Sequence, residues 1–429
     1  MRVLVIGAGG VGCAATKIAK RRNFFELWVV ADYSLDRSQR LMAELTDSDL
    51  ASDSVGDLAD PRFVAEQIDA ASAQEVAQMC RKYQITHVLN AVDPRFVLTI
   101  FDGAFAAGAH YLDTAMSLSK PHPTDPFHHP GVKLGDEQWA QSDKWREANL
   151  LALVGIGVEP GLANIFAKYA SDHLFSEIDE IGIRDGSNIA VAGYEFAPSF
   201  SIWTTIEECL NPPIIWTSTQ GWFTTEPFSE PEVFDFPEGI GPVECVNVEH
   251  EEVVQIPRFI KCNKVTFKFG LGSEFISILN MLHKLGLDST EPVTVNGQKV
   301  SPRDLVAAVL PDPATIGDRM SGKTCAGTWI TGIGKNGQPR EVYLYHVADN
   351  DWTMREYQTQ AVVWQTAINP VIALELLARG IWHGTGVVSP DYFDAEPFLT
   401  MMADEYGQPF GIRDSQKSDL SAGLVEPAP

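Results

Sequence analysis

The sequence predicts an α/β protein in which a doubly wound parallel sheet carries an inserted α+β domain. Three observations point to this fold. A glycine-rich turn joins a short apolar run to a helix-forming stretch within residues 3–20, strand and helix patterns alternate as far as residue 155, and shorter β-branched segments recur after residue 177. Strands that alternate with helices form parallel sheets with covered faces, whereas short strands separated by turns are typical of antiparallel sheets.

The first predicted element is a strand at residues 3–6, because an unbroken β-branched apolar run suits a strand buried on both faces. A complete G-x-G-x-x-G motif follows it directly. Its members are expected to bind a dinucleotide: Gly7, Gly9, Gly10, Val11 and Gly12. The first glycine permits a tight turn, the second admits a diphosphate, and the third allows close helix–strand packing. Residues 13–20 predict the helix whose free N–H groups face the phosphates. This order predicts a Rossmann nucleotide-binding domain.

The second strand is predicted at residues 27–31, and an acidic residue stands at its tip. There the Asp32 carboxylate can accept both ribose hydroxyls of an adenosine. A 2′-phosphate would face the same carboxylate, so the sequence favours NAD and leaves NADP possible. Tyr33 is a neighbouring candidate for cofactor contact, and Arg37 is close enough in sequence to soften the preference.

The alternation of strands and helices continues through the first third of the chain. Further elements are predicted at residues 73–83, 87–92, 96–107, 110–114 and 152–155. Because ligands of doubly wound sheets bind outside the carboxyl ends of the strands, segments 90–93, 113–115 and 157–161 are expected around one cleft. The cofactor contacts expected from these strand ends are Asn90, Ala91, Val92 and Thr114.

The pattern changes after residue 177, where turn signals separate short segments of alternating or β-branched residues. This predicts an antiparallel sheet. Its strands are expected at residues 181–184, 243–248, 264–269, 327–331 and 342–347. Helical stretches at 274–285 and 302–310 indicate an α+β domain. Residues 359–379 predict a long apolar helix that packs back on the nucleotide domain, with a kink or junction at Pro370.

Composition excludes several classes of protein. The chain of 429 residues is 45% hydrophobic and 21% charged, which is typical of a globular protein. Its formal net charge of −25 disfavours nucleic acid as a binding partner and could attract cationic amines. Its six cysteines are scattered without a C-x-x-C pair, so we expect no metal site and a reducing compartment. The histidines of the proline-rich segment 119–130 are expected in a solvated loop.

No apolar run resembles a signal peptide or reaches membrane length, so we expect a cytoplasmic protein without a membrane partner.

One segment matches a nucleotide-binding motif by its letters alone. Residues 317–324 read G-x-x-x-x-G-K-T, but a P-loop needs a buried strand before it and a helix after it. Here a turn-like stretch precedes the motif and a strand pattern follows it. Lys323 is better interpreted as an anchor for a substrate carboxylate.

Several motifs together resemble a known family. They are GAGGVG at residues 7–12, NAV at 90–92, YLDTA at 111–115, GVEPG at 157–161, GKTCAG at 322–327 and the closing apolar helix. On these residues the chain resembles the saccharopine dehydrogenase-like family over nearly its whole length, and it is most similar to carboxynorspermidine dehydrogenase-like members. Two features depart from that branch. Asp32-Tyr33 stands where Ser-Arg suited to NADP is usual, and segment 120–139 is longer than expected.

The resemblance implies a Rossmann domain with an inserted α+β substrate domain, a homodimer, and NAD(P)-dependent chemistry at a C–N bond of an amine or amino acid. Oxidation of lysine by a lysine 6-dehydrogenase-type reaction and a non-catalytic NAD-binding scaffold stay open as alternatives. The expected divisions are a nucleotide-binding domain at residues 1–160, a substrate-binding and dimerisation domain at 161–358, a helical return at 359–414 and a flexible tail at 415–429.

Chemistry at a C–N bond requires a proton donor or acceptor near the nitrogen. The acidic candidates at the predicted cleft are Asp93, Asp113 and Glu159, and His346 is a further one. Structural roles are alternatives for these residues: Asp113 could cap a turn, Glu159 could orient the loop before Pro160, and His346 could be a core residue of a strand.

The substrate also needs charged and aromatic partners. Arg184 and Lys323 are candidates to bind a carboxylate, with Thr324 beside the lysine. Trp203 and Thr204 begin a segment that could bind an ammonium group through an aromatic face and the acids that follow, although a packing role for the tryptophan is the commoner one.

Overall fold

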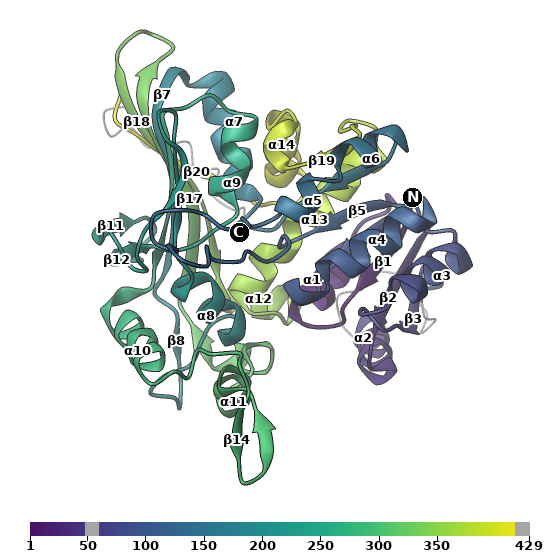
Figure 1. Cartoon of the computed structure of the whole chain (residues 1–429). Helices are drawn as coiled ribbons and strands as arrows, with labels where there is room; N and C mark the ends of the chain where they lie inside the picture. Colours follow the sequence, from purple (N-terminus) through teal and green to yellow (C-terminus); the bar gives the residue numbers. More distant parts are fainter. Residues whose placement is uncertain (48–59, 417–429) are drawn as a thin grey trace.

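The computed structural model describes residues 1–47 and 60–416. Two sheets make up most of the molecule, and they lie on opposite sides of Figure 1. The first is a parallel sheet built mainly from the N-terminal third of the chain, and the second is a larger mixed sheet. The predicted fold class is confirmed.

The first sheet has seven strands, all parallel, in the order β19-β6-β5-β4-β1-β2-β3. Its strands are β1 (Arg2–Ile6), β2 (Leu27–Asp32), β3 (Phe63–Gln67), β4 (His87–Asn90), β5 (His110–Asp113), β6 (Leu151–Leu153) and β19 (Gly386–Val388). The helices between them are α1 (Gly10–Lys20), α2 (Leu35–Asp47), α3 (Ala73–Tyr83), α4 (Val97–Ala107), α5 (Asp136–Trp139) and α6 (Ser142–Glu147). Unbroken apolar runs form the central strands because helices cover both faces.

The second sheet has nine strands. They are β7 (Phe175–Ser187), β9 (Ile214–Thr217), β10 (Gly221–Thr224), β11 (Glu232–Phe236), β12 (Gly241–Asn247), β13 (Lys264–Gly270), β17 (Lys323–Gly334), β18 (Pro339–Asp349) and β20 (Gly411–Asp414). Short pairs β8 (Ala190–Val191) with β16 (Met320–Ser321) and β14 (Val293–Val295) with β15 (Gln298–Val300) stand apart from it. The helices of this half are α7 (Leu162–His173), α8 (Ile202–Leu210), α9 (Glu252–Gln255), α10 (Gly272–Lys284), α11 (Pro302–Val309) and α12 (Asn350–Tyr357).

The expectation of a purely antiparallel second sheet is wrong at its centre. Strands β7 and β13 pair in parallel, with Ile181 opposite Val265. The long excursion between them allows the crossover that parallel neighbours require, and both strands are buried enough to accept it. All the other pairs of this sheet are antiparallel.

The helical return connects the two sheets. Helix α13 (Ala361–Ala378) packs along α1, and a methyl group on Gly10 would lie 3.1 Å from Val363 Cγ1. The sequence predicted a kink or a junction at Pro370. The junction is absent, because the helix continues to Ala378 and tertiary packing buries most of its side chains on both sides of the proline, and the kink stays a prediction. After it, β19 extends the first sheet, α14 (Glu396–Asp404) follows, and β20 joins the second sheet.

Helix α13 is also long and apolar enough, by length and composition, to cross a membrane. In this fold 83% of that apolar stretch is buried inside the protein, so its hydrophobicity is explained by packing.

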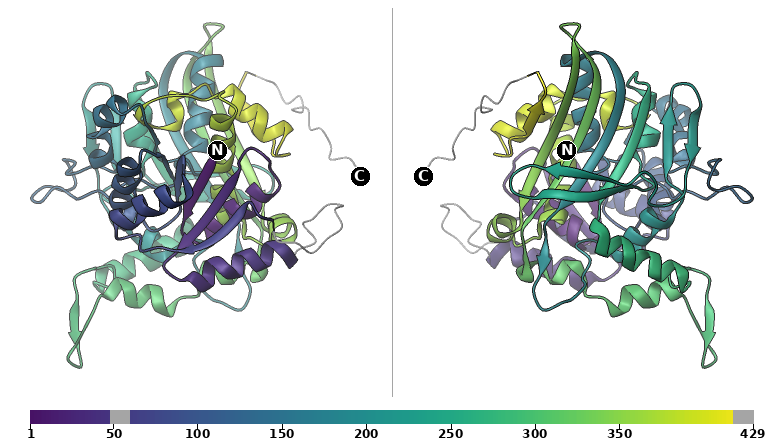
Figure 2. Two further views of the ribbon diagram at one scale, coloured as in Figure 1. Left: turned by 90° about the vertical axis from the view of Figure 1, so that its right-hand side faces the viewer. Right: turned by 90° about the vertical axis from the view of Figure 1, so that its left-hand side faces the viewer.

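A projecting arm extends from the second half of the chain. It consists of α10, α11 and the β14–β15 hairpin, and it points away from both sheets in Figures 1 and 2. Most of the tail expected at residues 415–429 lies outside the described residues.

Candidate functional site

The glycine-rich turn has the backbone geometry that its motif predicts. Gly7 has φ +108°, a conformation that favours glycine. A methyl group on Gly12 would lie only 1.8 Å from Gly7 O, so α1 can approach β1 only with glycine at this position. A methyl group on Gly9 would meet nothing within 4 Å, so this side of the turn is open. The turn therefore fits the diphosphate of a dinucleotide at the start of α1.

Asp32 lies beside this turn and is fixed by the backbone. Its Oδ2 accepts a hydrogen bond from Ala8 N at 2.9 Å, and its Oδ1 accepts one from Ser34 N at 3.0 Å. Each oxygen keeps a lone pair, so the carboxylate can still accept ribose hydroxyls. The adjacent Tyr33 is 68% exposed, and the Arg37 guanidinium lies 5.3 Å from its ring centroid.

The other cofactor candidates lie along the same sheet edge. A methyl group on Gly7 would meet Ala91 O and Val92 Cγ1, both at 2.7 Å, so the loop after β4 packs directly on the glycine turn. Asn90 supports this loop, since its Oδ1 accepts from Val92 N at 3.2 Å and its Nδ2 donates to Tyr111 Oη at 2.9 Å.

Helix α13 lies between the glycine turn and a cavity of about 110 Å³. Val363 contacts the turn, while its neighbours Val362 and Thr366 line the cavity. Thr366 also approaches the loop after β6, because a methyl group on Gly157 would lie 3.2 Å from Thr366 Cγ2 and 3.4 Å from Thr114 O. The cavity is therefore next to the carboxyl edge of the nucleotide-binding sheet.

Three acidic side chains stand among the polar residues that line this cavity. Among the described residues that line it there is neither a lysine nor an arginine. The polar and charged members are Glu159, Asp185, Ser187, Ser199, Thr205, Glu208, His250, Thr324, Gln365 and Thr366. Phe200 and Phe269 contribute aromatic surface. An acidic and aromatic cavity of this kind suits a cationic ligand.

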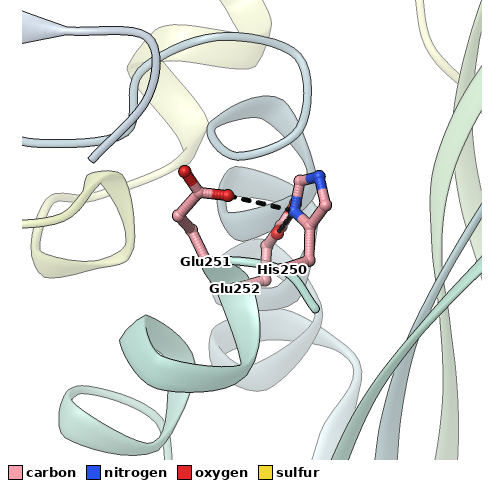
Figure 3. A group of neighbouring side chains, drawn as sticks. All are labelled: His250, Glu251 and Glu252. Carbon is pink, nitrogen blue, oxygen red and sulfur yellow. Dashed lines mark hydrogen bonds and ion pairs between the residues drawn. The ribbon is translucent and has the colours of Figure 1, made fainter. Parts of the chain in front are cut away.

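His250 is held in a buried acidic cluster shown in Figure 3. Its Nδ1 lies 2.5 Å from Glu252 Oε2 and 3.4 Å from Glu251 Oε2, and its ring stacks on Phe267 with centroids 3.8 Å apart. Burial lowers the pKa of His250, but the surrounding carboxylates, Glu252 foremost, outweigh burial and raise it to about 10. These three side chains also have the spacing of metal ligands. The ion pair of a protonated imidazole with two carboxylates accounts for their proximity.

The cavity carboxyl groups are strongly perturbed. Burial raises the pKa of Glu208 to about 8 and that of Asp185 to about 7. Burial and the neighbouring Asp185 raise the pKa of Glu159 well above its usual range. Groups that exchange protons near neutral pH inside a cavity are typical of active sites.

Of the four acid–base candidates, the structure brings only Glu159 to the cavity. Asp93 caps a turn and pairs with Arg95 at 2.8 Å. Asp113 is fully buried and accepts hydrogen bonds from Gly155 N at 2.6 Å and from Gln138 Nε2 at 2.8 Å, so it supports the loop after β6. His346 lies 2.9 Å from Gln365 Nε2 in the core, where burial lowers its pKa to about 4.

Of the five substrate candidates, only Thr324 lines the cavity, where its Oγ1 donates to Gln365 Oε1 at 2.8 Å. Arg184 does not line the cavity, contrary to the expectation that it binds the substrate. Successive residues of a strand face opposite sides of the sheet, so Arg184 points away from the cavity and pairs with Glu232 at 2.5 Å. Lys323 is also directed elsewhere, with its Nζ 3.9 Å from Glu238 Oε2.

The segment after Ser201 reaches the cavity through different residues from those expected. Trp203 donates to Asp304 at 3.2 Å and Thr204 also lies outside the lining, whereas Thr205 and Glu208 line the cavity. Residues three apart on a helix share a face, which explains why Thr205 and Glu208 line the cavity together.

Most of the lining was not predicted from the sequence, and the ionisable residues among those missed are Asp185 and His250. A detectable signal existed for the second, because residues 249–252 place four ionisable side chains in a row within an otherwise apolar segment. Residues 317–324 do not form a P-loop, since a short turn and then strand β17 occupy that segment.

Comparisons with known proteins match nearly the whole chain. The model of the saccharopine dehydrogenase NADP binding domain matches residues 3–153, and that of the saccharopine dehydrogenase C-terminal domain matches residues 157–408. A carboxynorspermidine synthase of Vibrio cholerae is 29% identical over 407 residues and 94% of both chains. A carboxyaminopropylagmatine dehydrogenase of Synechocystis is 27% identical over 411 residues, covering 95% of this chain and 96% of the relative.

A solved structure has the same fold. The apo saccharopine dehydrogenase (L-Glu forming) of Saccharomyces cerevisiae superposes with a TM-score of 0.65 at 13% identity, covering 96% of this chain and 99% of the other. The two family models divide the chain where the nucleotide-binding sheet passes into the second half, and the solved structure shares the fold. The chain belongs to the saccharopine dehydrogenase family.

Proposed function

We propose that this NAD(P)-dependent oxidoreductase of C–N bonds acts on a polyamine adduct whose amine portion binds in the acid-lined cavity. The observation that carries the proposal is the cavity itself, which offers three carboxyl groups and aromatic faces next to the nucleotide-binding sheet and has no lysine or arginine among its described lining residues. Relatives named for carboxynorspermidine and carboxyaminopropylagmatine, both of which contain several amines, support this substrate class.

The cofactor is proposed to be NAD in preference to NADP. The glycine turn would hold the diphosphate and Asp32 the adenosine ribose, where a 2′-phosphate would face a carboxylate. The family model is described as an NADP binding domain, so cofactor preference is a point on which this chain can differ from other members. When bound, the nicotinamide supplies or accepts the hydride.

The chain's own residues then bind and orient the amine. Glu208 is proposed to pair with an ammonium group, and the rings of Phe200 and Phe269 to pack against the methylene chain of the substrate. Glu159 is proposed as the acid–base, since it is the one acidic candidate of the four that lines the cavity.

The test is the absorbance of reduced nicotinamide in the presence of purified protein. NAD and NADP are offered with carboxynorspermidine, carboxyaminopropylagmatine, saccharopine and lysine, and the reverse reaction is tried with diamine plus aldehyde. We expect NAD-dependent turnover of a polyamine adduct that is strongly weakened in Glu208→Gln. The matched control Asp102→Asn, on the exposed face of α4, should behave as the wild type. Turnover of lysine or saccharopine alone would contradict the substrate class, and silence with intact cofactor binding would favour the scaffold alternative.

Two copies of the chain are proposed to associate through the projecting arm, in the cytoplasm. The arm carries large apolar side chains that are at least half exposed: Met281, Leu285, Val293, Val295, Leu305 and Val309. Exposed apolar patches of this kind are typical of interaction surfaces. We also propose that residues 1–160 with the return at 359–414 bind the cofactor, while residues 161–358 supply most of the amine site and the interface; Glu159 and residues of the return complete the amine site. Light scattering should give a dimer for the wild type and a monomer for Val309→Glu with Leu285→Glu.

A further inference from the structure

We propose that Glu159 and Asp185 share a single proton and act together as the acid–base at the substrate nitrogen. This inference rests on the proposed function and deepens it by identifying a second residue for proton transfer. Asp185 was not among the candidates that the sequence offered, and no match to a known protein assigns it a role.

The two carboxyl groups come from different halves of the molecule. Glu159 lies in the loop between β6 and α7, at the carboxyl edge of the nucleotide-binding sheet, whereas Asp185 is near the end of β7 in the second sheet. Both are fully buried, both line the cavity, and they lie within hydrogen-bonding reach of one another. The substrate nitrogen would therefore meet a pair of carboxyl groups that only the assembled fold creates.

Each carboxyl group also has an oxygen that the protein leaves unpaired. Glu159 Oε1 and Asp185 Oδ1 have no hydrogen-bond partner among the described residues. Buried polar atoms are rarely left unsatisfied, so such atoms call for a functional explanation. Here a proton held between the two carboxyl groups would supply a missing hydrogen bond.

A shared proton follows from the charges around the pair. Two buried carboxylates this close cannot both ionise without a large electrostatic cost, so one holds a proton that the other accepts as a hydrogen bond. The backbone N–H groups of Gly327 and Gly270 face Glu159 and Asp185 respectively. The titratable groups that face the pair from the surrounding elements are Glu208, Cys209, Cys245, His250, Glu252, Cys325 and Tyr343.

Asp185 is the partner more easily ionised. The positive charge of His250 favours its carboxylate form, whereas Glu159 is surrounded by acids and buried surface. The pair at rest is therefore Glu159 as the carboxylic acid and Asp185 as the carboxylate.

The proton balance of the reaction requires a base at the substrate nitrogen, and the carboxylate of the pair supplies it. An amine that arrives protonated must lose its N–H proton before its carbon can release a hydride. The N–H bond breaks and an O–H bond forms on Asp185, which leaves both carboxyl groups protonated, while the two electrons of the C–H bond leave with the hydride to the oxidised cofactor. The substrate then holds a C=N bond, and the reverse direction returns the proton to nitrogen as the C–H bond forms.

The experiment compares Glu159→Gln and Asp185→Asn with the wild type and with Glu208→Gln, which removes a cavity carboxyl outside the pair. Circular dichroism and NADH fluorescence first establish that each variant folds and binds cofactor. Both pair variants should lose about 100-fold or more in kcat and lose the acid limb of the pH profile of kcat/KM. Glu208→Gln should raise KM and keep that limb, and Glu159→Asp should recover part of the activity.

Infrared difference spectra provide a readout that does not need turnover. Several buried acids hold protons near neutral pH, Glu208 and Asp113 among them, so the wild-type band of protonated carboxyl groups is compared with that of each variant. Glu159→Gln should remove the component that belongs to the pair, Asp185→Asn should shift it, and Glu208→Gln should retain it. Folded pair variants that keep the wild-type pH profile, or a spectrum without that component, would overturn the shared proton. A wild type that shows the component but turns over no amine would instead overturn the proposed function.

Discussion

Two alanine substitutions in the glycine turn should separate folding from cofactor binding. At Gly12 the added methyl group would lie 1.8 Å from Gly7 O, well inside van der Waals contact, so the turn and α1 must move apart by more than an ångström. Overpacking of this kind costs about 3 kcal/mol, which corresponds to a fall in Tm of about 6–12 °C for a domain of this size. At Gly9 the same methyl group meets nothing within 4 Å, and φ is −86°. Gly9→Ala should therefore leave the free energy of unfolding within about 0.5 kcal/mol of the wild type.

Cofactor affinity should respond differently. The methyl group in Gly9→Ala occupies the open side of the turn, where a diphosphate approaches the backbone, and should weaken NADH binding by about tenfold or more. Thermal unfolding without cofactor and fluorescence titration with NADH measure the two effects separately. The reasoning is refuted if Gly9→Ala binds NADH as the wild type does, or if Gly12→Ala unfolds at the wild-type temperature.

Three further predictions follow from single side chains. Asp32→Ser should raise kcat/KM for NADP relative to NAD by about 10- to 100-fold, because it removes a carboxylate that faces the 2′-phosphate. Steady-state kinetics with both cofactors measure this ratio, and an unchanged ratio of the two kcat/KM values would contradict the prediction. Burial raises the pKa of Asp113 from 3.8 to about 7, so its neutral form stabilises the fold below pH 4 and this contribution is lost as the pH rises towards 7. Urea unfolding of the wild type should therefore lose stability over that window relative to Asp113→Asn, by an amount of the order of 4 kcal/mol at most, and parallel curves for the two proteins would count against it. Lys323→Met should leave kcat/KM for every amine unchanged, since the Lys323 side chain faces Glu238 outside the cavity. Glu208→Gln should instead raise KM by about tenfold, because it removes a charged contact to the amine. Equal changes in KM for the two variants would show that the amine binds outside this cavity.

The local sequence was sufficient to predict most of the nucleotide-binding half. Strand β1, the glycine turn and α1 follow one another in the order that the motif requires, and α3 has the bounds expected from its helical pattern. Such elements are predictable because the turn geometry and helix signals act over a few residues.

The second half depended more on long-range contacts. The parallel pairing of β7 with β13 and the addition of β19 to the first sheet join segments far apart in the chain. No local pattern distinguishes parallel from antiparallel neighbours when both strands are buried. The continuity of α13 through Pro370 was likewise decided by the packing around it.

The sequence by itself determined the cofactor class, through a glycine motif and an acidic residue that act within one βαβ unit. Only the tertiary structure decided which charged residues form the amine site. Alternation along β7 turns Asp185 into the cavity and Arg184 away from it, and the fold brings Glu159 and His250 to the same place from separate segments. A strand's register against its neighbours sets which face each side chain occupies, and that register is fixed by contacts across the whole sheet.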